Sequence, residues 1–140
     1  MNESNRGPGW TAAKRLGGKV AVVIGAGQSP GEGVGNGRAA AMRYAREGAH
    51  VLAVDRSLDS AEETAAAIRQ EGFDSVALAA DVTREGDLAH AMQEVQRLWG
   101  SLDILHNNVG VSIAGGDADV LDITEEAFDN ICRKIGRAHV

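Results

Sequence analysis

The feature that most constrains this chain is a glycine-rich segment between an apolar run and a helix-forming run. The apolar run, residues 20–24 (VAVVI), is rich in β-branched residues and predicts a strand that is buried on both faces of a sheet. Residues 39–47 (AAAMRYARE) favour a helix. A strand, a glycine loop and a helix in this order let backbone N–H groups converge on an anion at the helix N-terminus. The usual anion at such a loop is a pyrophosphate.

The glycine spacing allows two registers for this loop. The pattern G-x-G-x-x-G fails over residues 25–30 (GAGQSP), whereas residues 35–40 (GNGRAA) satisfy the form that ends in alanine. We therefore expect residues 28–34 to be an insertion, and residues 31–37 (GEGVGNG) offer the alternative register. A flexible turn without a ligand is the alternative function. The residues of the loop that are candidates for cofactor contacts are Gly25, Gly27, Gly35, Asn36 and Gly37.

Strand and helix patterns alternate along the rest of the chain. Further strands are expected at residues 50–54, 75–80 and 102–105. Further helices are expected from Asp59 to residue 71, from Thr83 to residue 99, and from Thr124 onward, each opened by the named residue as a cap. This alternation predicts an α/β fold in which right-handed βαβ units build a parallel sheet.

An acidic residue at the end of the second predicted strand supports nucleotide binding. Asp55 stands 18 residues after Gly37, close to the offset at which a carboxylate accepts hydrogen bonds from an adenosine ribose. A carboxylate there would repel a 2′-phosphate, so NAD is favoured over NADP. Arg56 is also a candidate for cofactor contact, since its guanidinium could accommodate that phosphate. The alternative for Asp55 is a turn residue at a strand end.

The overall charge and the cysteine content exclude several other functions. The net charge of −6 over 140 residues argues against a nucleic acid or an anionic membrane as partner. No apolar run reaches membrane-spanning length and no signal-peptide pattern is visible, so we expect a cytoplasmic protein. Cys132 is the single cysteine and is expected to be buried on an apolar helix face. No Cys/His spacing indicates a metal site.

The landmarks of this chain resemble those of the short-chain dehydrogenase/reductase family. They are Gly25…Gly35-x-Gly37, Asp55, Asp81-Val82 and residues 102–110 (LDILHNNVG). In the last of these, Val109 replaces the alanine of the family's Asn-Asn-Ala-Gly. The resemblance covers residues 14–133. It implies a Rossmann-type doubly wound parallel sheet with strand order 3-2-1-4, truncated after about four strands.

The resemblance also assigns roles to residues. It implies that Asp81 and Val82 hold the adenine, that Asp55 holds the ribose, and that the glycine loop holds the pyrophosphate. The segment that would lie beneath the nicotinamide ribose is Asn107, Asn108, Val109 and Gly110. The implied activity is NAD(P)-dependent hydride transfer between nicotinamide and a small alcohol or ketone, in a full-length form that assembles as a homo-oligomer.

The family's catalytic residues are not in this chain. A tyrosine four residues before a lysine serves as acid and base in the family, and a serine orients the substrate. The single tyrosine here is Tyr44, and Gly48 follows it at the position due for lysine. We therefore assign no catalytic residue and expect the chain to be inactive by itself. The alternatives are a non-catalytic nucleotide-binding fragment and a Rossmann-like methyltransferase, and Ile24 argues against the latter because methyltransferases usually have an acidic residue there.

Three segments are expected along the chain. Residues 1–18 are predicted to be a flexible lead-in, and residues 19–133 an NAD-binding half-domain. Residues 134–140 are expected to be a non-native tail, because Ile-Gly-Arg-Ala-His-Val is what a common short-read sequencing adaptor encodes in one frame. A natural short variant is the alternative. In such a half-domain the fourth strand would be an unpaired edge.

Overall fold

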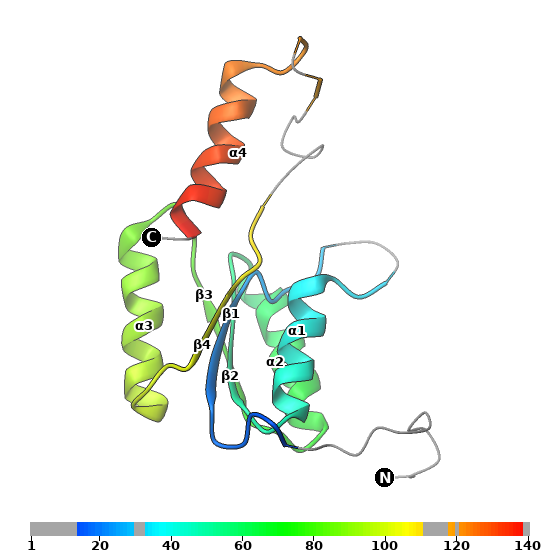
Figure 1. Ribbon diagram of the computed structural model, residues 1–140, viewed down its shortest axis with the longest axis vertical. Coiled ribbons are helices and arrows are strands. Elements are labelled where there is room, and N and C mark those ends of the chain that lie inside the picture. Colours follow the sequence, from blue (N-terminus) through cyan, green and yellow to red (C-terminus); the bar gives the residue numbers. More distant parts are fainter. Residues whose placement is uncertain (1–13, 30–32, 111–117, 120, 139–140) are drawn as a thin grey trace.

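The computed structural model describes residues 14–29, 33–110, 118–119 and 121–138. They form a parallel sheet of four strands with helices on both faces (Figure 1). The elements in chain order are β1 (Val20–Ile24), α1 (Asn36–Arg46), β2 (His50–Asp55), α2 (Leu58–Gln70), β3 (Ser75–Ala79), α3 (Glu85–Trp99), β4 (Ile104–Asn107) and α4 (Glu125–Ala138). The strand order is β3-β2-β1-β4, which confirms the predicted fold class and topology. The predictions for residues 1–13 and 139–140 lie outside the described residues.

Strand β1 lies in the centre of the sheet and is buried along its whole length. It pairs in parallel with β2, where Val22 lies opposite Leu52, and with β4, where Val22 lies opposite Leu105. Alternate side chains of β1 enter two separate apolar clusters. Figure 1 shows α1 and α2 on one face of the sheet and α3 on the other. The apolar run that the sequence predicts as a doubly buried strand is therefore the core of the fold.

The two faces of the sheet are packed with side chains of different size. On the face of α1 and α2 the buried cluster is rich in alanine: Ala21, Val23, Ala26, Ala41, Ala45, Ala49, Val51, Ala53, Ala65 and Ile68. On the face of α3 it is Val20, Val22, Ile24, Leu52, Val54, Ala80, Val82 and Val95. Small side chains let α1 and α2 lie close to the strands, which brings their N-termini close to the ends of β1 and β2.

Two predicted helix caps are wrong. Helix α2 begins after Ser57, whose hydroxyl oxygen accepts a hydrogen bond from the Ser60 backbone N–H at 3.3 Å, and Asp59 lies inside the first turn. Helix α3 begins after Arg84 without a side-chain cap. Thr83 instead donates its hydroxyl to the carboxylate of Asp81 at 2.7 Å. Asp59 and Thr83 both have side chains that can cap a helix, but the helices begin after Ser57 and Arg84 instead.

Strand β4 begins two residues later than predicted. Asp103 lies just before it, and its backbone N–H donates to the carbonyl of Val20 at 3.0 Å while its side chain accepts from the Val20 N–H at 2.9 Å. The Asp103 carboxylate thus accepts the N–H of Val20, which a backbone carbonyl of a paired strand would otherwise accept. Leu102, which was predicted to open the strand, is 39% exposed.

Helix α4 lies beyond the carboxyl ends of the strands rather than on a face of the sheet (Figure 1). Thr124 caps it as predicted, since its hydroxyl accepts from the Ala127 N–H at 3.1 Å. Cys132 is exposed, contrary to the prediction, because this helix does not lie against the core. Among the described helices, none is long and apolar enough to cross a membrane.

Candidate functional site

A cleft of about 840 Å³ opens at the carboxyl ends of the strands. This is the edge of a parallel α/β sheet at which ligands bind. Of the residues predicted from the sequence, those that line it are Gly25, Gly27, Gly35, Asn36, Gly37, Asp55, Arg56, Asp81, Val82, Asn108, Val109 and Gly110. Asn107 is not among the lining residues, and its side-chain oxygen is buried at the end of β4. The fold thus brings four separate sequence landmarks to one cleft.

The glycine loop brings its two ends together. Gly25 has a φ of 81°, and a Cβ atom added there would lie 2.1 Å from the carbonyl oxygen of Asn108. A Cβ atom added at Gly37 would overlap the carbonyl of Gly25. Gly25 and Gly37 are therefore neighbours in space, although they are twelve positions apart in sequence. This geometry favours the register with an insertion, while Gly31 of the alternative register lies outside the described residues.

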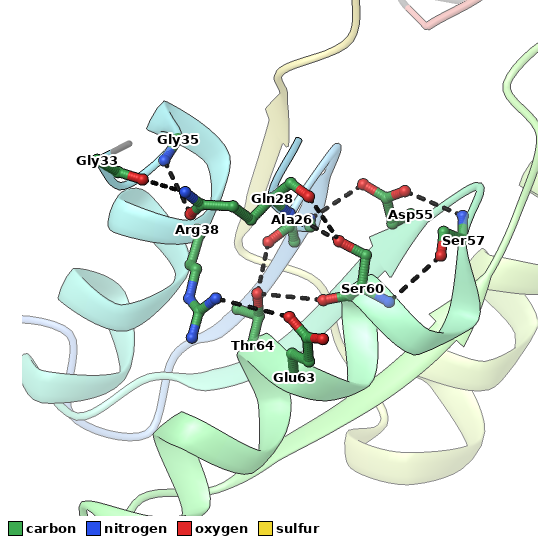
Figure 2. Close-up of polar contacts among 11 residues, drawn as sticks. Ala26, Gln28, Gly33, Gly35, Arg38, Asp55, Ser57, Ser60, Glu63 and Thr64 are labelled. Atoms are coloured by element: carbon green, nitrogen blue, oxygen red, sulfur yellow. Dashed lines mark hydrogen bonds and ion pairs between the residues drawn. The ribbon is translucent and has the colours of Figure 1, made fainter. Parts of the chain in front are cut away.

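The carboxylate of Asp55 lies beside the turn that follows β1 (Figure 2). One of its oxygens accepts the backbone N–H of Gly27 at 3.0 Å, and the other accepts the backbone N–H of Ser57 at 3.0 Å. Two N–H donors orient the side chain and stabilise its charge. A carboxylate oxygen has more than one lone pair, so Asp55 keeps the capacity to accept hydroxyl groups from the cleft.

Asn108 connects β4 to the turn of residues 25–28, which we call the first glycine turn. Its backbone N–H donates to the carbonyl of Ile24 at 2.8 Å, which continues the pairing of β1 with β4 by one residue. Its side-chain amide donates to the carbonyl of Gly25 at 3.4 Å. A residue 83 positions away in sequence therefore fixes the glycine turn. This contact gives the second asparagine of the Asn-Asn-Val-Gly segment a structural role.

The N–H groups of the first glycine turn are already bonded within the protein. Those of Gly25 and Ala26 donate to the carbonyl of Val54 at 2.8 and 2.9 Å. The N–H of Gly27 donates to Asp55, as described above. The N–H of Gln28 donates to the hydroxyl of Ser60 at 2.7 Å. This turn consequently has no N–H to offer a phosphate.

Donors for an anion remain at the start of α1. The first N–H groups of a helix have no partner within the helix, and the helix dipole favours negative charge there. The N–H of Gly35 donates to the side-chain oxygen of Gln28 at 3.1 Å, and the side-chain nitrogen of Gln28 donates to the carbonyl of Gly33 (Figure 2). Asn36 and Gly37 stand in the first turn of α1 and line the cleft. The chain can therefore bind an anion at the N-terminus of α1.

Asp81 is held in its ionised form at the other end of the cleft. One of its carboxylate oxygens accepts both the hydroxyl of Thr83 at 2.7 Å and the backbone N–H of Thr83 at 2.9 Å. These hydrogen bonds lower the pKa of Asp81, and the nearby cations Arg84 and Arg56 lower it further. An ionised carboxylate at this point can accept an N–H or O–H from a ligand.

Sequence reasoning missed several polar residues of the cleft. Gln28 and Ser60 line it, and Lys134 joins them from α4. The fully buried Thr64 follows Ser60 by one helical turn on α2. A pair of hydroxyl residues four positions apart on one helix was a visible signal. Such pairs are common on helices, however, and only the packing of α2 against the glycine turn shows what they contact.

Among the described residues that line the cleft there is no tyrosine. The hydroxyl of Tyr44 lies 2.7 Å from Nδ1 of His106 on β4, and neither residue lines the cleft. Within the described ranges, no group of three or more His, Cys, Asp and Glu side chains could hold a metal ion. What this arrangement can do is bind a ligand that carries an anion and hydroxyl groups.

Three comparisons with known proteins agree on one family. The family model described as short chain dehydrogenase matches residues 19–134. A trihydroxynaphthalene reductase from Colletotrichum orbiculare is 37% identical over 126 residues, which are 89% of this chain and 42% of that protein. A sorbitol dehydrogenase from Cereibacter sphaeroides is 38% identical over 117 residues, or 84% of this chain and 41% of that protein.

The structural comparison gives the same result. A solved protein from Burkholderia xenovorans, described as a short-chain dehydrogenase/reductase, superposes with a TM-score of 0.78 at 38% identity. A short chain dehydrogenase from Mycobacterium smegmatis superposes with a TM-score of 0.77 at 29% identity. The alignments cover 86% and 89% of this chain but 46% and 50% of those chains. The chain thus spans less than half the length of the curated relatives named above.

Proposed function

The chain belongs to the short-chain dehydrogenase/reductase family, whose members are oxidoreductases that use NAD(H) or NADP(H), and we propose that its cleft binds NAD. The adenosine and the pyrophosphate would lie along the strand ends, with the nicotinamide directed toward Asn108. The longer protein would transfer a hydride between the nicotinamide and a small alcohol or ketone. We further propose that this longer protein is a cytoplasmic homo-oligomer.

The observation that carries the choice of NAD is the oriented carboxylate of Asp55. Its two oxygens are fixed by the N–H groups of Gly27 and Ser57, so the charge cannot turn away from the cleft without losing both bonds. A fixed carboxylate accepts the two hydroxyls of an adenosine ribose and repels a 2′-phosphate. Arg56 offers a cation nearby, but it is exposed at the rim.

Each remaining part of the cofactor has a matching part of the cleft. The N-terminus of α1 would take the pyrophosphate, because Asn36 and Gly37 line the cleft and the first N–H groups of a helix have no partner within it. Asp81 and Val82 would hold the adenine. The segment of residues 107–110 would lie beneath the nicotinamide ribose. The cofactor supplies the hydride chemistry, and these residues supply binding and orientation.

Catalysis would require residues that this chain lacks. No tyrosine or lysine of the described cleft stands in the acid–base arrangement of the family, so we expect the chain to bind the cofactor without turnover. The methyltransferase alternative gains no support from the family match, and the end of β1 carries Ile24 rather than an acidic residue.

The test is a calorimetric titration of the chain with NAD, NADP and S-adenosylmethionine. We expect NAD to bind and NADP to bind about tenfold more weakly or worse, a difference of about 1.4 kcal/mol that a like-charge contact readily provides. Tighter binding of S-adenosylmethionine than of either dinucleotide would overturn the proposal. Equal affinity for NAD and NADP would overturn the role of Asp55 while leaving the dinucleotide site intact.

A further inference from the structure

We propose that Ser60 and Thr64, one turn apart on α2, are positioning residues that hold the first glycine turn in the shape that leaves the cleft open to the cofactor. Both hydroxyls bond to the backbone of residues 26–28 (Figure 2). This inference rests on the proposed function of the cleft and adds to it a part of the fold that none of the landmarks described above includes. Ser60 and Thr64 act through the turn, not by touching the reacting atoms.

Thr64 carries the first contact, in the interior of the protein. Its side chain has no solvent exposure, and its hydroxyl donates to the carbonyl of Ala26 at 2.8 Å. Ala26 is also fully buried. A buried carbonyl without a donor is strongly disfavoured, so this hydroxyl fixes the direction of the peptide unit that follows Ala26. A valine would fill the same volume, and the hydroxyl is therefore not needed for packing.

Ser60 makes the second contact, with Gln28, which lies two residues after Ala26 in the turn. Its hydroxyl oxygen accepts the N–H of Gln28 at 2.7 Å and its hydroxyl lies 3.2 Å from the carbonyl of the same residue. A Cβ atom added at Gly27 would lie 2.4 Å from this hydroxyl oxygen and 2.6 Å from the nearer carboxylate oxygen of Asp55. Ser60 and Asp55 therefore both lie close to Gly27, in the space that a side chain there would occupy.

The three side chains together fix consecutive peptide units. Thr64 bonds to the carbonyl of Ala26, Asp55 to the N–H of Gly27, and Ser60 to both backbone groups of Gln28. The turn is thereby attached to the same β2–α2 unit that carries the ribose acceptor. Gly25, at the start of the turn, also contacts Gly37 at the N-terminus of α1. The turn therefore links the carboxylate of Asp55 to the start of α1. A binding group displaced by a fraction of an ångström loses affinity, so loosening the turn weakens cofactor binding.

The experiment compares four variants of the chain. Thr64→Val removes a hydroxyl at constant volume, Thr64→Ser retains it, and Ser60→Ala removes the other. Ser75→Ala is the matched control, because the buried hydroxyl of Ser75 also donates to a backbone carbonyl, that of Val51 at 2.9 Å, outside the cleft. Each variant is titrated with NAD and melted, and the exchange of its Gly27 and Gln28 amide hydrogens is measured without cofactor.

We expect Thr64→Val and Ser60→Ala to weaken NAD binding about five- to tenfold, as the loss of one or two hydrogen bonds allows. Thr64→Ser should stay within about twofold of the parent chain. Ser75→Ala should lower the melting temperature about as much as Thr64→Val and leave NAD affinity unchanged. Amide hydrogen exchange at Gly27 and Gln28 should speed up in Thr64→Val and Ser60→Ala, and in neither of the other two variants.

Two results would overturn the inference. One is NAD affinity in Thr64→Val equal to that of Thr64→Ser, and the other is an affinity loss in Ser75→Ala as large as in Thr64→Val. The first would show that the hydroxyl does not matter, and the second that any loss of stability lowers affinity. If the parent chain binds no NAD, the proposed function fails, and the exchange rates still decide whether the two hydroxyls hold the turn.

Discussion

A Cβ atom added at Gly37 would lie 1.8 Å from the carbonyl oxygen of Gly25. The first turn of α1 thus touches the turn after β1 backbone to backbone, at a distance that no side chain allows. The two glycines are twelve positions apart in sequence, and this contact joins the two ends of the cofactor loop.

Gly37→Ala should therefore disrupt both the loop and the cleft. The new methyl group meets backbone atoms that cannot rotate away, so α1 has to move. We expect the NAD affinity to fall by about tenfold or more and the melting temperature to fall with it. Gly86→Ala is the matched control, since a Cβ atom there meets nothing within 4 Å on α3. It should stabilise the chain by about 0.4–1 kcal/mol and leave affinity unchanged. A Gly37→Ala variant with the NAD affinity and melting temperature of the parent chain would contradict this contact.

Asp55→Asn should alter the choice between cofactors. Both carboxylate oxygens accept backbone N–H groups, and the amide nitrogen of asparagine would face one of these donors. We expect NAD affinity to fall about tenfold and the ratio of NADP to NAD affinity to rise, because the repelling charge is gone. Calorimetry with both dinucleotides measures the ratio. Asp59→Asn, an exposed change of the same charge on α2, should leave the ratio as it was. An unchanged ratio in Asp55→Asn would remove the basis for NAD preference.

The buried carboxylate of Glu47 should make stability depend on pH. Glu47 is 4% exposed and accepts the Arg15 side chain at 3.0 Å, and Arg43 also bonds to it. Hydrogen bonds from Arg15 lower the pKa of Glu47. A lowered folded-state pKa stabilises the fold above the unfolded pKa of about 4.3, and the effect is lost as the pH falls through the folded value. Glu47→Gln should hence be less stable than the parent chain at pH 7, with a gap that narrows below about pH 4.

Urea denaturation from pH 7 to pH 3 measures this gap. Glu63→Gln is the control, because the side chain of Glu63 is 68% exposed and lies 3.9 Å from its arginine partner. Its stability relative to the parent should change little over the same range. A Glu47→Gln gap that is constant with pH would show that the carboxylate is not stabilised by its charge.

Strand β4 should make the chain self-associate. It is the edge of the described sheet, and Leu105 on it is 48% exposed. An apolar edge with unpaired backbone groups pairs readily with another chain. We expect light scattering to detect association at micromolar concentration, and Leu105→Lys to reduce it. Leu58→Lys changes an apolar residue of similar exposure, 52%, away from this edge, and should have little effect. A parent chain that melts cooperatively as a monomer would contradict the prediction.

The sequence pattern was sufficient for the alternation of strands and helices, and the family resemblance supplied the strand order and most of the cleft. The apolar run of β1 is continuous, and each helix has an apolar stripe, so the alternation of elements is unambiguous. The cleft residues predicted from the family landmarks mostly meet in one place, because every landmark follows a strand and the carboxyl ends of parallel strands share one edge. Asn107 is the exception, since the last residue of β4 is still within the sheet.

The sequence was insufficient where two residues compete for one role. Ser57 and Asp59 are both good helix caps, and the choice depends on Asp55, which bonds to the N–H of Ser57 and holds that residue extended. Thr83 is a good cap by itself, but the carboxylate of Asp81 takes its hydroxyl. Contacts between residues two positions apart decided both cases, and propensity alone does not weigh them.

The residues that contact the glycine turn also become available in a fixed order during synthesis. Everything that holds residues 25–28 from the β2–α2 side has been translated once Thr64 has been added, whereas Asn108 follows 44 residues later. At about 5–20 residues per second, this delay is roughly 2–9 seconds. For that time the nascent chain on the ribosome can have a turn attached to α2 but no fourth strand to close it. Chaperones or a neighbouring nascent chain would meet the open side of β1 during this interval.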